Sequence, residues 1–475
     1  MSHSFPRICA NPLLTLLFLL LAAPPSRAGE VDNLLNQVDW PSLENRARDW
    51  LQEYLRIDTT NPPGHESLAA DFLESKLKEF GHTVQRLSAA PGRDNLLWRL
   101  KGNGESRAIL LMGHSDVVGA EPMTWTHPPF DGVIEDGYLW GRGAIDTKSL
   151  TIIQLISLLE LDRLSVPRKR DFILLVPADE ETGGSAGVEW LLNEDPSLLN
   201  VEYVLDEGAT GIAGLDLPVD HLMVIGTGEK GLVWIKLKTH GDVGHGSIPW
   251  KKNAVFRLTR AVSKLQTDGG PPTLCMSSRR FLEAILETKG LPHSDSDASL
   301  LNTVAALCPE DSISRRKLVG MASNTINATQ LKSGFKVNVV PGEAEATIDC
   351  RLVPGTKVED FVEWIRTLID DPGVEIEIIT SSPASESSPD TGLFKILAET
   401  VESRIAKSQA VPFLTLGGSD SRFFRNQGIP SYAFNPVELD EADFTAHQPN
   451  EKVSLAKLNS AVRIYLEVLL KLALQ

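Results

Sequence analysis

Five segments of the chain place histidine or carboxylate side chains where strands, turns or polar loops are expected. They are His114-Ser115-Asp116, the turn with Asp146, Asp179-Glu180-Glu181, Asp206-Glu207, and the loop with His447. Each alone has an ordinary explanation: Asp146 could cap a helix, and His447 could face solvent. Together they offer two imidazoles and at least three carboxylates but no thiolate. This set suits zinc, manganese or cobalt rather than an iron–sulfur or copper centre.

The spacing of these residues divides the chemistry among them. His114 and Asp116 point to one face of an expected strand, so Asp116 can accept the second N–H of a metal-binding imidazole. Three adjacent carboxylates at positions 179–181 repel each other unless a cation or a shared proton compensates. Two metals about 3.5–4 Å apart would acidify a water, and a free carboxylate would carry its proton to a leaving amine. Glu180 and Glu181 can divide these two tasks because adjacent side chains diverge.

From about residue 40, helical segments alternate with short apolar runs, as in a parallel or mixed sheet covered by helices. Strands are expected at Leu96–Leu100, Ala108–Val118, Asp171–Ala178 and Val201–Asp206, and helices at Ala69–Phe80 and Leu150–Leu161. Charged segments follow the last three strands. In open α/β sheets, sites form at the carboxyl ends of the strands, so the chemistry is expected there.

After residue 229 the pattern changes to alternating strands and amphipathic helices, which is typical of an α+β domain. The expected elements are strands at Leu232–Lys238 and Ala344–Leu352 and helices at Ala254–Leu265 and Val358–Leu368. A Ser/Pro-rich stretch, Ser381–Pro389, reads as a linker. We therefore expect an α/β catalytic domain with a central mixed sheet flanked by helices, formed by residues 29–229 and 381–475. An α+β domain is inserted at 230–380.

Residues 1–28 have the pattern of a secretory signal peptide. Arg7 supplies a weak positive region, Leu13–Ala22 an apolar region, and Ser26-Arg27-Ala28 a cleavage site. A signal anchor is the alternative. No later apolar run approaches the ~20 residues of a membrane helix. We expect a protein exported to the periplasm or secreted, without stable membrane insertion after cleavage.

Composition limits the partners and the use of cysteine. The 475 residues carry a net charge of -17, which argues against nucleic acid or an anionic membrane as a partner and favours a small substrate. Cys275, Cys308 and Cys350 follow the signal region, too few for a disulfide scaffold and without zinc-ligand spacing. One disulfide bridge, such as Cys275 to Cys308, is an alternative that the sequence leaves undecided.

In combination, these motifs resemble the M20 family of metallopeptidases and aminoacylases, which includes carboxypeptidase S-like, aminoacylase-like and succinyl-diaminopimelate desuccinylase-like enzymes. The resemblance covers nearly the whole mature chain. Gly417-Gly418-Ser419-Asp420-x-Arg422-Phe423 and His447-x-x-Asn450-Glu451 complete the order of its motifs. It implies a zinc-peptidase catalytic domain with an inserted lid or dimerisation domain. It also implies two Zn²⁺ per subunit, with Co²⁺ or Mn²⁺ as substitutes.

The resemblance assigns a role to each residue of the metal site. Asp146 would bridge the metals, with His114 and either Asp206 or Glu207 on one of them, and Glu181 and His447 on the other. Glu180 would be the general base, and Asp116 would orient His114. Between the two acids at positions 206 and 207, Glu207 is favoured.

The resemblance also assigns substrate contacts. Gly244-His245-Gly246-Ser247-x-Pro249 matches a motif whose histidine stabilises the oxyanion, often from the neighbouring subunit, so a homodimer through the inserted domain is expected. Asn338 and Arg351 match positions that bind the substrate carboxylate in some members of the family, and the planar fork of arginine suits that task. Gly417 and Gly418 are also placed at the substrate. Gln448 departs from the family, which usually has glycine after the last histidine.

The function implied is a two-zinc hydrolase that cleaves a peptide or N-acyl amide bond beside a free carboxylate, as a carboxypeptidase or N-acyl-amino-acid amidohydrolase does. One alternative is an aminopeptidase or dipeptidase that anchors the free amine. Another is a metal-binding protein of the same fold without catalysis. Loss of catalysis usually removes the base or a ligand, and every expected group is present, which disfavours this last alternative.

Overall fold

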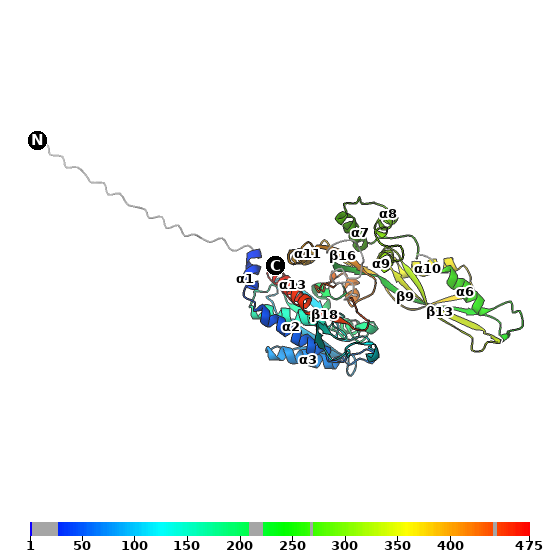
Figure 1. The fold of residues 1–475 in the computed structure, drawn as a ribbon, viewed down its shortest axis with the longest axis horizontal. Coiled ribbons are helices and arrows are strands. Elements are labelled where there is room, and N and C mark those ends of the chain that lie inside the picture. The colour runs from blue at the N-terminus through cyan, green and yellow to red at the C-terminus, as the bar shows by residue number, and fades with distance from the viewer. Residues whose placement is uncertain (2–26, 209–221, 267–268, 440–443) are drawn as a thin grey trace.

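The computed structural model describes Met1 and residues 27–208, 222–266, 269–439 and 444–475. The predicted signal peptide, residues 1–28, lies outside the described residues apart from Met1 and the first two positions of helix α1 (Arg27–Leu35). Figure 1 shows a rounded main lobe, which carries α2 and α13, and an elongated inserted domain, which carries α6, β9 and β13. None of the described helices is both long and apolar enough to cross a membrane.

In the described part of the chain, the main lobe is built on a nine-stranded mixed sheet in the order β1-β2-β6-β3-β7-β17-β8-β15, with β16 paired to β8. The strands are β1 (Gln85–Ser88), β2 (Asp94–Leu100), β3 (Ala108–Met112), β6 (Phe172–Val176), β7 (Val201–Asp206), β8 (Leu222–Glu229), β15 (Ser385–Glu386), β16 (Gln409–Thr415) and β17 (Ser431–Ala433). Strands β6, β3, β7 and β17 run parallel, so their carboxyl ends lie at one edge. The predicted α/β class with a central mixed sheet is confirmed.

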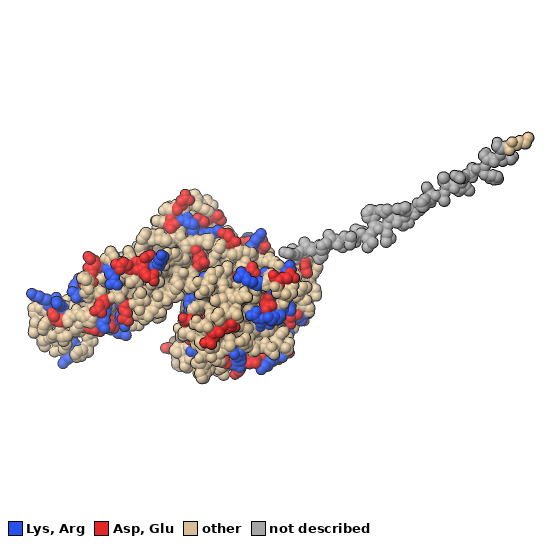
Figure 2. All heavy atoms as spheres, turned by 180° about the vertical axis from the view of Figure 1, so that it is seen from behind, with Lys and Arg blue, Asp and Glu red and all other residues tan. Residues whose placement is uncertain are grey.

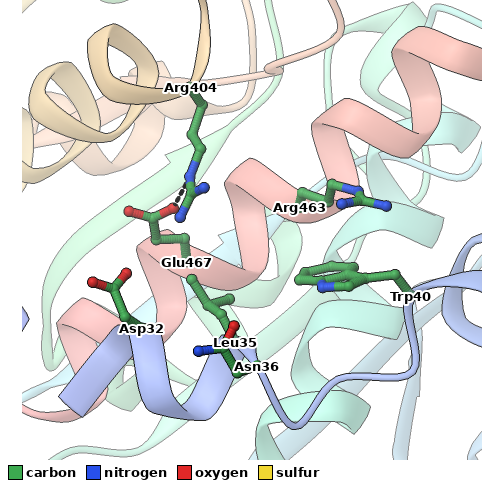
Figure 3. A pocket seen from close by; sticks show the side chains of 7 residues that line it. All are labelled: Asp32, Leu35, Asn36, Trp40, Arg404, Arg463 and Glu467. Atoms are coloured by element: carbon green, nitrogen blue, oxygen red, sulfur yellow. Dashed lines mark hydrogen bonds and ion pairs between the residues drawn. The ribbon is translucent and has the colours of Figure 1, made fainter. Parts of the chain in front are cut away.

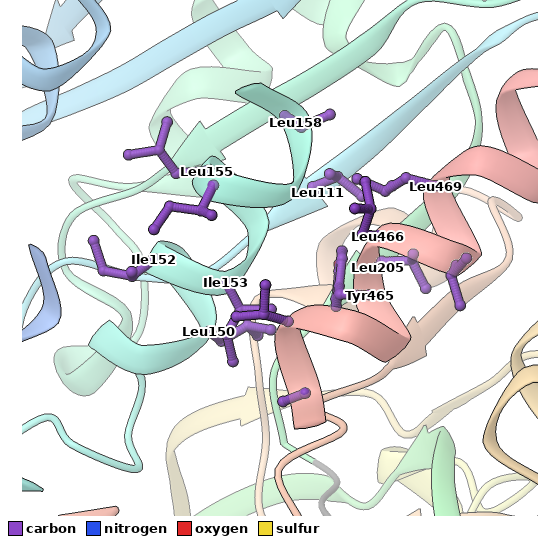
Figure 4. Close-up of a cluster of buried hydrophobic side chains, with 14 of the residues drawn as sticks. Leu111, Leu150, Ile152, Ile153, Leu155, Leu158, Leu205, Tyr465, Leu466 and Leu469 are labelled. Atoms are coloured by element: carbon purple, nitrogen blue, oxygen red, sulfur yellow. The ribbon is translucent and has the colours of Figure 1, made fainter. Parts of the chain in front are cut away.

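Helices cover both faces of this sheet because its strands are apolar on both sides. Every residue of β3 and β6 is buried, as strands between two helical layers require. Helices α4 (Lys148–Arg163) and α13 (Leu455–Ala473) pack against one face, where Ile153 and Leu466 lie near Leu111 of β3 and Leu205 of β7 (Figure 4). The opposite face packs against α5 (Val188–Glu194) and α12 (Ser421–Arg425).

The remaining elements of the main lobe surround this core. Its other helices include α2 (Trp40–Leu55), α3 (Glu66–Glu79) and α11 (Gly392–Arg404), with 3-10 turns η1 (Pro122–Thr124), η2 (Glu180–Thr182) and η3 (Pro196–Leu199). A small sheet in the order β18-β5-β4 joins β4 (Val133–Glu135), β5 (Tyr138–Trp140) and β18 (Lys452–Ser454). This small sheet brings the segment after His447 beside the segment before Asp146.

The inserted domain has an antiparallel four-stranded sheet in the order β11-β13-β9-β14. Its elements are β9 (Gly231–His240), β11 (Thr325–Ser333), β13 (Glu343–Leu352), β14 (Val374–Ser382), α6 (Ala254–Lys264) and α10 (Val358–Ile369), with β10 (Gly244–His245) paired to β12 (Val339–Val340). Side chains alternate along β9, and Val233, Ile235 and Leu237 are buried under α6 and α10. The stretch predicted as a linker at 381–389 contains the end of β14 and all of β15.

The segment 230–380, predicted as one insertion, divides between two cores. Helices α7 (Met276–Thr288), α8 (Asp297–Ala305) and α9 (Ile313–Ala322) pack against β8 and β16 of the main lobe rather than against the inserted sheet. The chain therefore passes between the lobes more often than an uninterrupted insertion requires. Among the described residues, Cys275, Cys308 and Cys350 are buried thiols without a disulfide between them.

One strand is shorter than predicted, and this changes the setting of the first motif. The expected strand Ala108–Val118 ends at Met112, and residues 113–118 form a loop. Pairing with β6 stops there, and the next amides bond outside the ladder: Ser115 N donates to Pro177 O and Val117 N to Thr59 O. His114 and Asp116 therefore do not share a strand face.

Candidate active site

Three adjacent parallel strands carry the chemical groups of the site at their carboxyl ends. His114 follows β3, Glu180 and Glu181 lie in the η2 turn after β6, and Glu207 follows β7 directly. Because β3 lies between β6 and β7, its histidine lies between the two groups of carboxylates. The site is thus at the sheet edge where open α/β folds bind ligands.

The cluster contains two overlapping groups of candidate metal ligands that share His114. In one, ligand atoms of His114, Asp146 and Glu181 all lie within 4.8 Å of one another, and in the other those of His114, Glu180 and Glu207 do. Asp146 faces both histidines: its Oδ1 is 3.1 Å from His114 Nε2 and its Oδ2 is 3.1 Å from His447 Nε2. A carboxylate with one oxygen toward each imidazole is placed to bridge two cations.

His447 completes the cluster from a loop on the far side of Asp146. Its Nε2 lies 3.2 Å from Glu181 Oε2. The backbone of His447 has a φ of 62°, an uncommon value for a residue other than glycine. Gln448, which stands where the family usually has glycine, donates its N–H to Thr445 O at 2.9 Å and closes the turn.

Asp146 is held by a residue to which the sequence analysis gave no role. The carboxylate of Glu451 is buried and accepts the N–H groups of Ile145 at 2.7 Å and Asp146 at 3.0 Å. Arg142 Nη1 also donates to it at 2.6 Å. Glu451 thus fixes the turn that aims Asp146 at the two histidines. Its place in a motif with His447 was the signal that could have revealed it.

Asp116 acts on the backbone of the neighbouring turn as well as on His114. His114 Nδ1 is 2.9 Å from the Asp116 carbonyl oxygen and 3.4 Å from its Oδ1. The same carboxylate accepts the N–H groups of Glu180 at 3.2 Å and Glu181 at 3.1 Å, and Asn61 Nδ2 donates to it at 2.8 Å. Asp116 therefore joins the imidazole to the turn that carries both glutamates.

Asp206 and Asp179 point away from the cluster. Asp206 Oδ2 accepts the N–H of Ser421 at 2.9 Å and its hydroxyl at 2.8 Å, at the start of α12. Of the two acids predicted as alternatives, it is Glu207 that joins the cluster. Asp179 pairs with Arg93 at 2.6 Å and accepts the N–H of Ala186 at 2.8 Å, so it holds the loop after β6.

The predicted substrate contacts are divided between the two lobes. His245 and Asn338 lie in the inserted domain, where Gly246 N donates to Asn338 O at 2.8 Å and His245 Nδ1 lies 2.8 Å from Ser247 Oγ. Arg351 lies on β13 and pairs with Asp349 through its Nε at 2.8 Å. Gly417 and Gly418 are exposed in the main lobe after β16. The structure thus gathers the metal-ligand candidates but leaves His245, Asn338 and Arg351 on the other lobe.

The donor set fits divalent cations. Glu181 Oε1 is buried and has no hydrogen-bond partner among the described residues. Burial raises the pKa of Glu207 well above the usual value of a glutamate, and the Asp146 and Glu180 carboxylates add to the rise. Cations among these carboxylates would relieve their repulsion and their desolvation. Imidazole and carboxylate donors without a thiolate suit zinc, manganese or cobalt.

The family follows from these motifs and from a direct match. The model of peptidase family M20/M25/M40 matches residues 110–471. The chain belongs to this family. It is accordingly a metal-dependent hydrolase of amide bonds.

Curated relatives and solved structures agree with this membership. An N-fatty-acyl-amino acid synthase/hydrolase of Xenopus tropicalis is 28% identical over 417 residues, covering 83% of this chain and 80% of the relative. A probable carboxypeptidase S-like protein of Dictyostelium discoideum is 30% identical, covering 78% and 73%, and aminoacylase-1 of Sus scrofa is 26% identical, covering 89% and 94%. An M20 family metallo-carboxypeptidase of Sulfolobus solfataricus has the same fold, with a TM-score of 0.70, 20% identity, and coverage of 90% of this chain and 98% of that one.

A hollow elsewhere on the main lobe contains none of the candidate ligands. It has a volume of about 420 Å³ and lies between α1, the start of α2 and α13. Figure 3 shows Arg404 bonded to Glu467 and Arg463 beside Trp40 in this hollow. Its arginines are engaged by partners of the same chain, since Arg463 also pairs with Glu44. The cluster at the strand ends remains the site to which the motifs and the family point.

Proposed function

We propose that the protein is a two-zinc hydrolase that cleaves a peptide or N-acyl amide bond beside a free carboxylate, in a carboxypeptidase or an N-acyl-amino-acid amidohydrolase reaction. The observation that carries the proposal is Asp146, which has one carboxylate oxygen facing each of two imidazoles. The relatives named as carboxypeptidase S-like, aminoacylase and N-fatty-acyl-amino acid synthase/hydrolase support this class of substrate.

The proposed mechanism gives each residue a task. His114, Asp146, Glu181, Glu207 and His447 would hold the cations, which when bound polarise the substrate carbonyl and acidify a water. Glu180 takes the proton of the attacking water and delivers it to the leaving nitrogen. Burial raises the pKa of Glu180 well above its usual value, and the nearby carboxylates Asp420 and Glu181 add to the rise. A carboxyl group with a raised pKa is suited to accept a proton and then release it.

The first test changes the base alone. Glu180→Gln keeps the size of the side chain but cannot accept the proton, so we expect turnover of N-acyl amino acids to fall by about 10²–10⁴-fold. Metal content, measured by elemental analysis, should stay near two zinc ions per chain, as in the wild type. Turnover indifferent to the substitution, or protein without metal, would refute the proposed mechanism.

The alternative is an aminopeptidase or dipeptidase that anchors the free amine, and substrate modification separates the two. We expect an acetylated N-terminus to be tolerated and an amidated C-terminus to abolish cleavage, since Arg351 would hold the carboxylate. The opposite pattern would favour the alternative.

We further propose a homodimer through the inserted domain. Strand β11 is one of the two edge strands of its sheet and is exposed from Asn327 onward, and such an edge can pair with a second copy. Leu331 of this strand is 62% exposed, and Phe256 of α6 in the same domain is 64% exposed. This arrangement would let His245 of one subunit serve the site of the other.

The pattern of residues 1–28 supports export to the periplasm or secretion.

A further inference from the structure

Two adjacent buried residues, one acidic and one basic, lie where the chain leaves the central sheet for the inserted domain. Glu229 ends β8, and after Lys230 the chain enters β9 at Gly231. Glu229 and Lys230 are only 2% and 3% exposed. A buried charge is costly unless it is paired and hydrogen-bonded, so the partners of each residue show what it holds in place.

Glu229 binds the loop that contains Gly417 and Gly418. Its Oε2 accepts both the N–H of Ser419, at 2.6 Å, and the Ser419 hydroxyl, at 3.1 Å. Its Oε1 accepts Arg425 Nη1 at 2.8 Å. The Ser419 carbonyl in turn accepts Arg422 Nη1 at 2.7 Å. Every polar group of Ser419 is therefore engaged, and the two exposed glycines directly precede this fixed residue.

Glu229, Lys230 and Gly231 also lie beside other segments where the chain passes between the two lobes. Ser385 Oγ, where the chain returns from the inserted domain, lies 3.4 Å from Glu229 Oε1. Lys230 Nζ donates to Gly320 O at 2.9 Å and to Ser323 O at 2.8 Å, where α9 leads into β11. A Cβ on Gly231 would lie 2.6 Å from Ala384 N, so the outgoing and returning segments are in direct contact.

We propose that Glu229 is a positioning residue that fixes the Gly417–Ser419 loop for substrate binding and couples this loop to the orientation of the inserted domain. A rotation of that domain turns the chain at Gly231 and at residues 382–385, directly beside the carboxylate that holds Ser419. The orientation of His245, Asn338 and Arg351 and the shape of the glycine loop are thereby linked. This inference rests on the proposed function in one respect, the place of Gly417 and Gly418 at the substrate.

The test compares Glu229→Gln with a matched control, Glu467→Gln. Glutamine keeps the shape of the side chain but removes the charge that binds Ser419 and Arg425. Glu467 is also buried and paired with an arginine, Arg404, but lies in the hollow of Figure 3. We expect Glu229→Gln to raise KM about tenfold with kcat changed less than about threefold, because hydrogen bonds to a charged group are lost. Glu467→Gln should leave both constants unchanged.

A second readout does not depend on turnover. Hydrogen–deuterium exchange without substrate should be faster in Glu229→Gln for peptides spanning 415–422 and 380–387, and unchanged there in Glu467→Gln. Should Glu229→Gln fail to fold, Ser419→Ala removes only the hydroxyl and should raise KM about threefold. Unchanged exchange in both peptides, or a KM equal to that of the control, would overturn the inference. If the wild-type protein shows no turnover, only the proposed function is refuted. The hydrogen–deuterium exchange measurement would still test whether Glu229 couples the Gly417–Ser419 loop to the inserted domain.

Discussion

At the scale of single residues, the candidate site is organised by carboxylates that are not themselves ligand candidates. Asp116 holds the backbone of Glu180 and Glu181, and Glu451 holds the backbone of Asp146. The carboxylate oxygens of each accept backbone N–H groups that would otherwise lack partners beside the cluster. Such partners preorganise ligands and tune metal affinity. The geometry of the site is therefore built into the protein, and the cations would enter a prepared set of donors.

The carboxylate of Glu451 provides the first prediction at this scale. Glu451→Gln removes the charge that binds Arg142 and replaces one acceptor oxygen by a donor, so the turn around Asp146 loses part of its support. We expect metal affinity to fall about 10–100-fold. Titration of metal-free protein with zinc measures this change. Glu467→Gln, remote from the site, is the control, and equal affinity in both variants would contradict the assigned role.

Much of the residue-level site could be predicted because its motifs are local. His114, Asp146, Glu181 and His447 are each marked by neighbours in the sequence, and the structure gathers them. The choice between the acids at 206 and 207 could not be derived, because both lie at the end of the same strand and only the hydrogen bonds of Asp206 to Ser421 separate them. The role of Glu451 depends on a contact across more than three hundred residues, so its place in the motif with His447 marks the residue but not the turn that it holds.

At the scale of elements, the periodicity of apolar residues predicted the strands and helices, and contacts between elements determined where they end. The predicted strand Ala108–Val118 is longer than β3, because pairing with β6 stops at Met112 and the next amides bond to loop carbonyls outside the ladder. The segment that forms α7–α9 was expected within the inserted domain because it lies inside the predicted range 230–380. Their apolar faces instead cover β8 and β16. The order of elements along the chain does not show which of the two cores a helix packs against.

Lys230 carries the prediction at this scale, because it joins α9 to β11. Burial, with the nearby Arg351, lowers the pKa of Lys230 to about 7 from the ordinary 10.5. Between these values the unfolded chain binds more protons than the folded protein, so the lysine makes stability rise with pH. Relative to Lys230→Met, we expect the wild-type free energy of unfolding to rise from pH 7 to 10 by at most about 1.4 kcal/mol per pH unit. Denaturant titrations at several pH values measure this slope.

The control for that measurement is Lys332→Met, which removes an exposed lysine of β11. This variant should keep the pH dependence of the wild type, because its side chain already lies in solvent. A wild-type slope equal to that of Lys230→Met would show that Lys230 stays charged in the fold. The lysine would then hold the α9–β11 passage by charge as well as by hydrogen bonds.

At the scale of the whole molecule, the candidate residues are divided between two lobes. The main lobe carries the candidate ligands and the base, whereas the inserted domain carries His245, Asn338 and Arg351 and extends away from the main lobe (Figure 1). On the face seen in Figure 2, basic and acidic side chains are interspersed, and much of the surface is uncharged. The proposed contact between copies of the chain would use the edge strand β11, whose exposed residues are mostly polar with Leu331 among them.

The proposed dimer predicts complementation between two inactive variants. Glu180→Gln lacks the base, and His245→Ala lacks the group that would stabilise the oxyanion, so each alone should have little activity. If His245 serves the neighbouring site, a mixed dimer contains one complete site, made of Glu180 from one subunit and His245 from the other. Random exchange of subunits should then restore about a quarter of wild-type activity, because about half of the dimers are mixed. Turnover measured after subunit exchange, with light scattering to establish the dimer, decides the matter. No recovery in verified mixed dimers would mean that His245 acts on the site of its own chain.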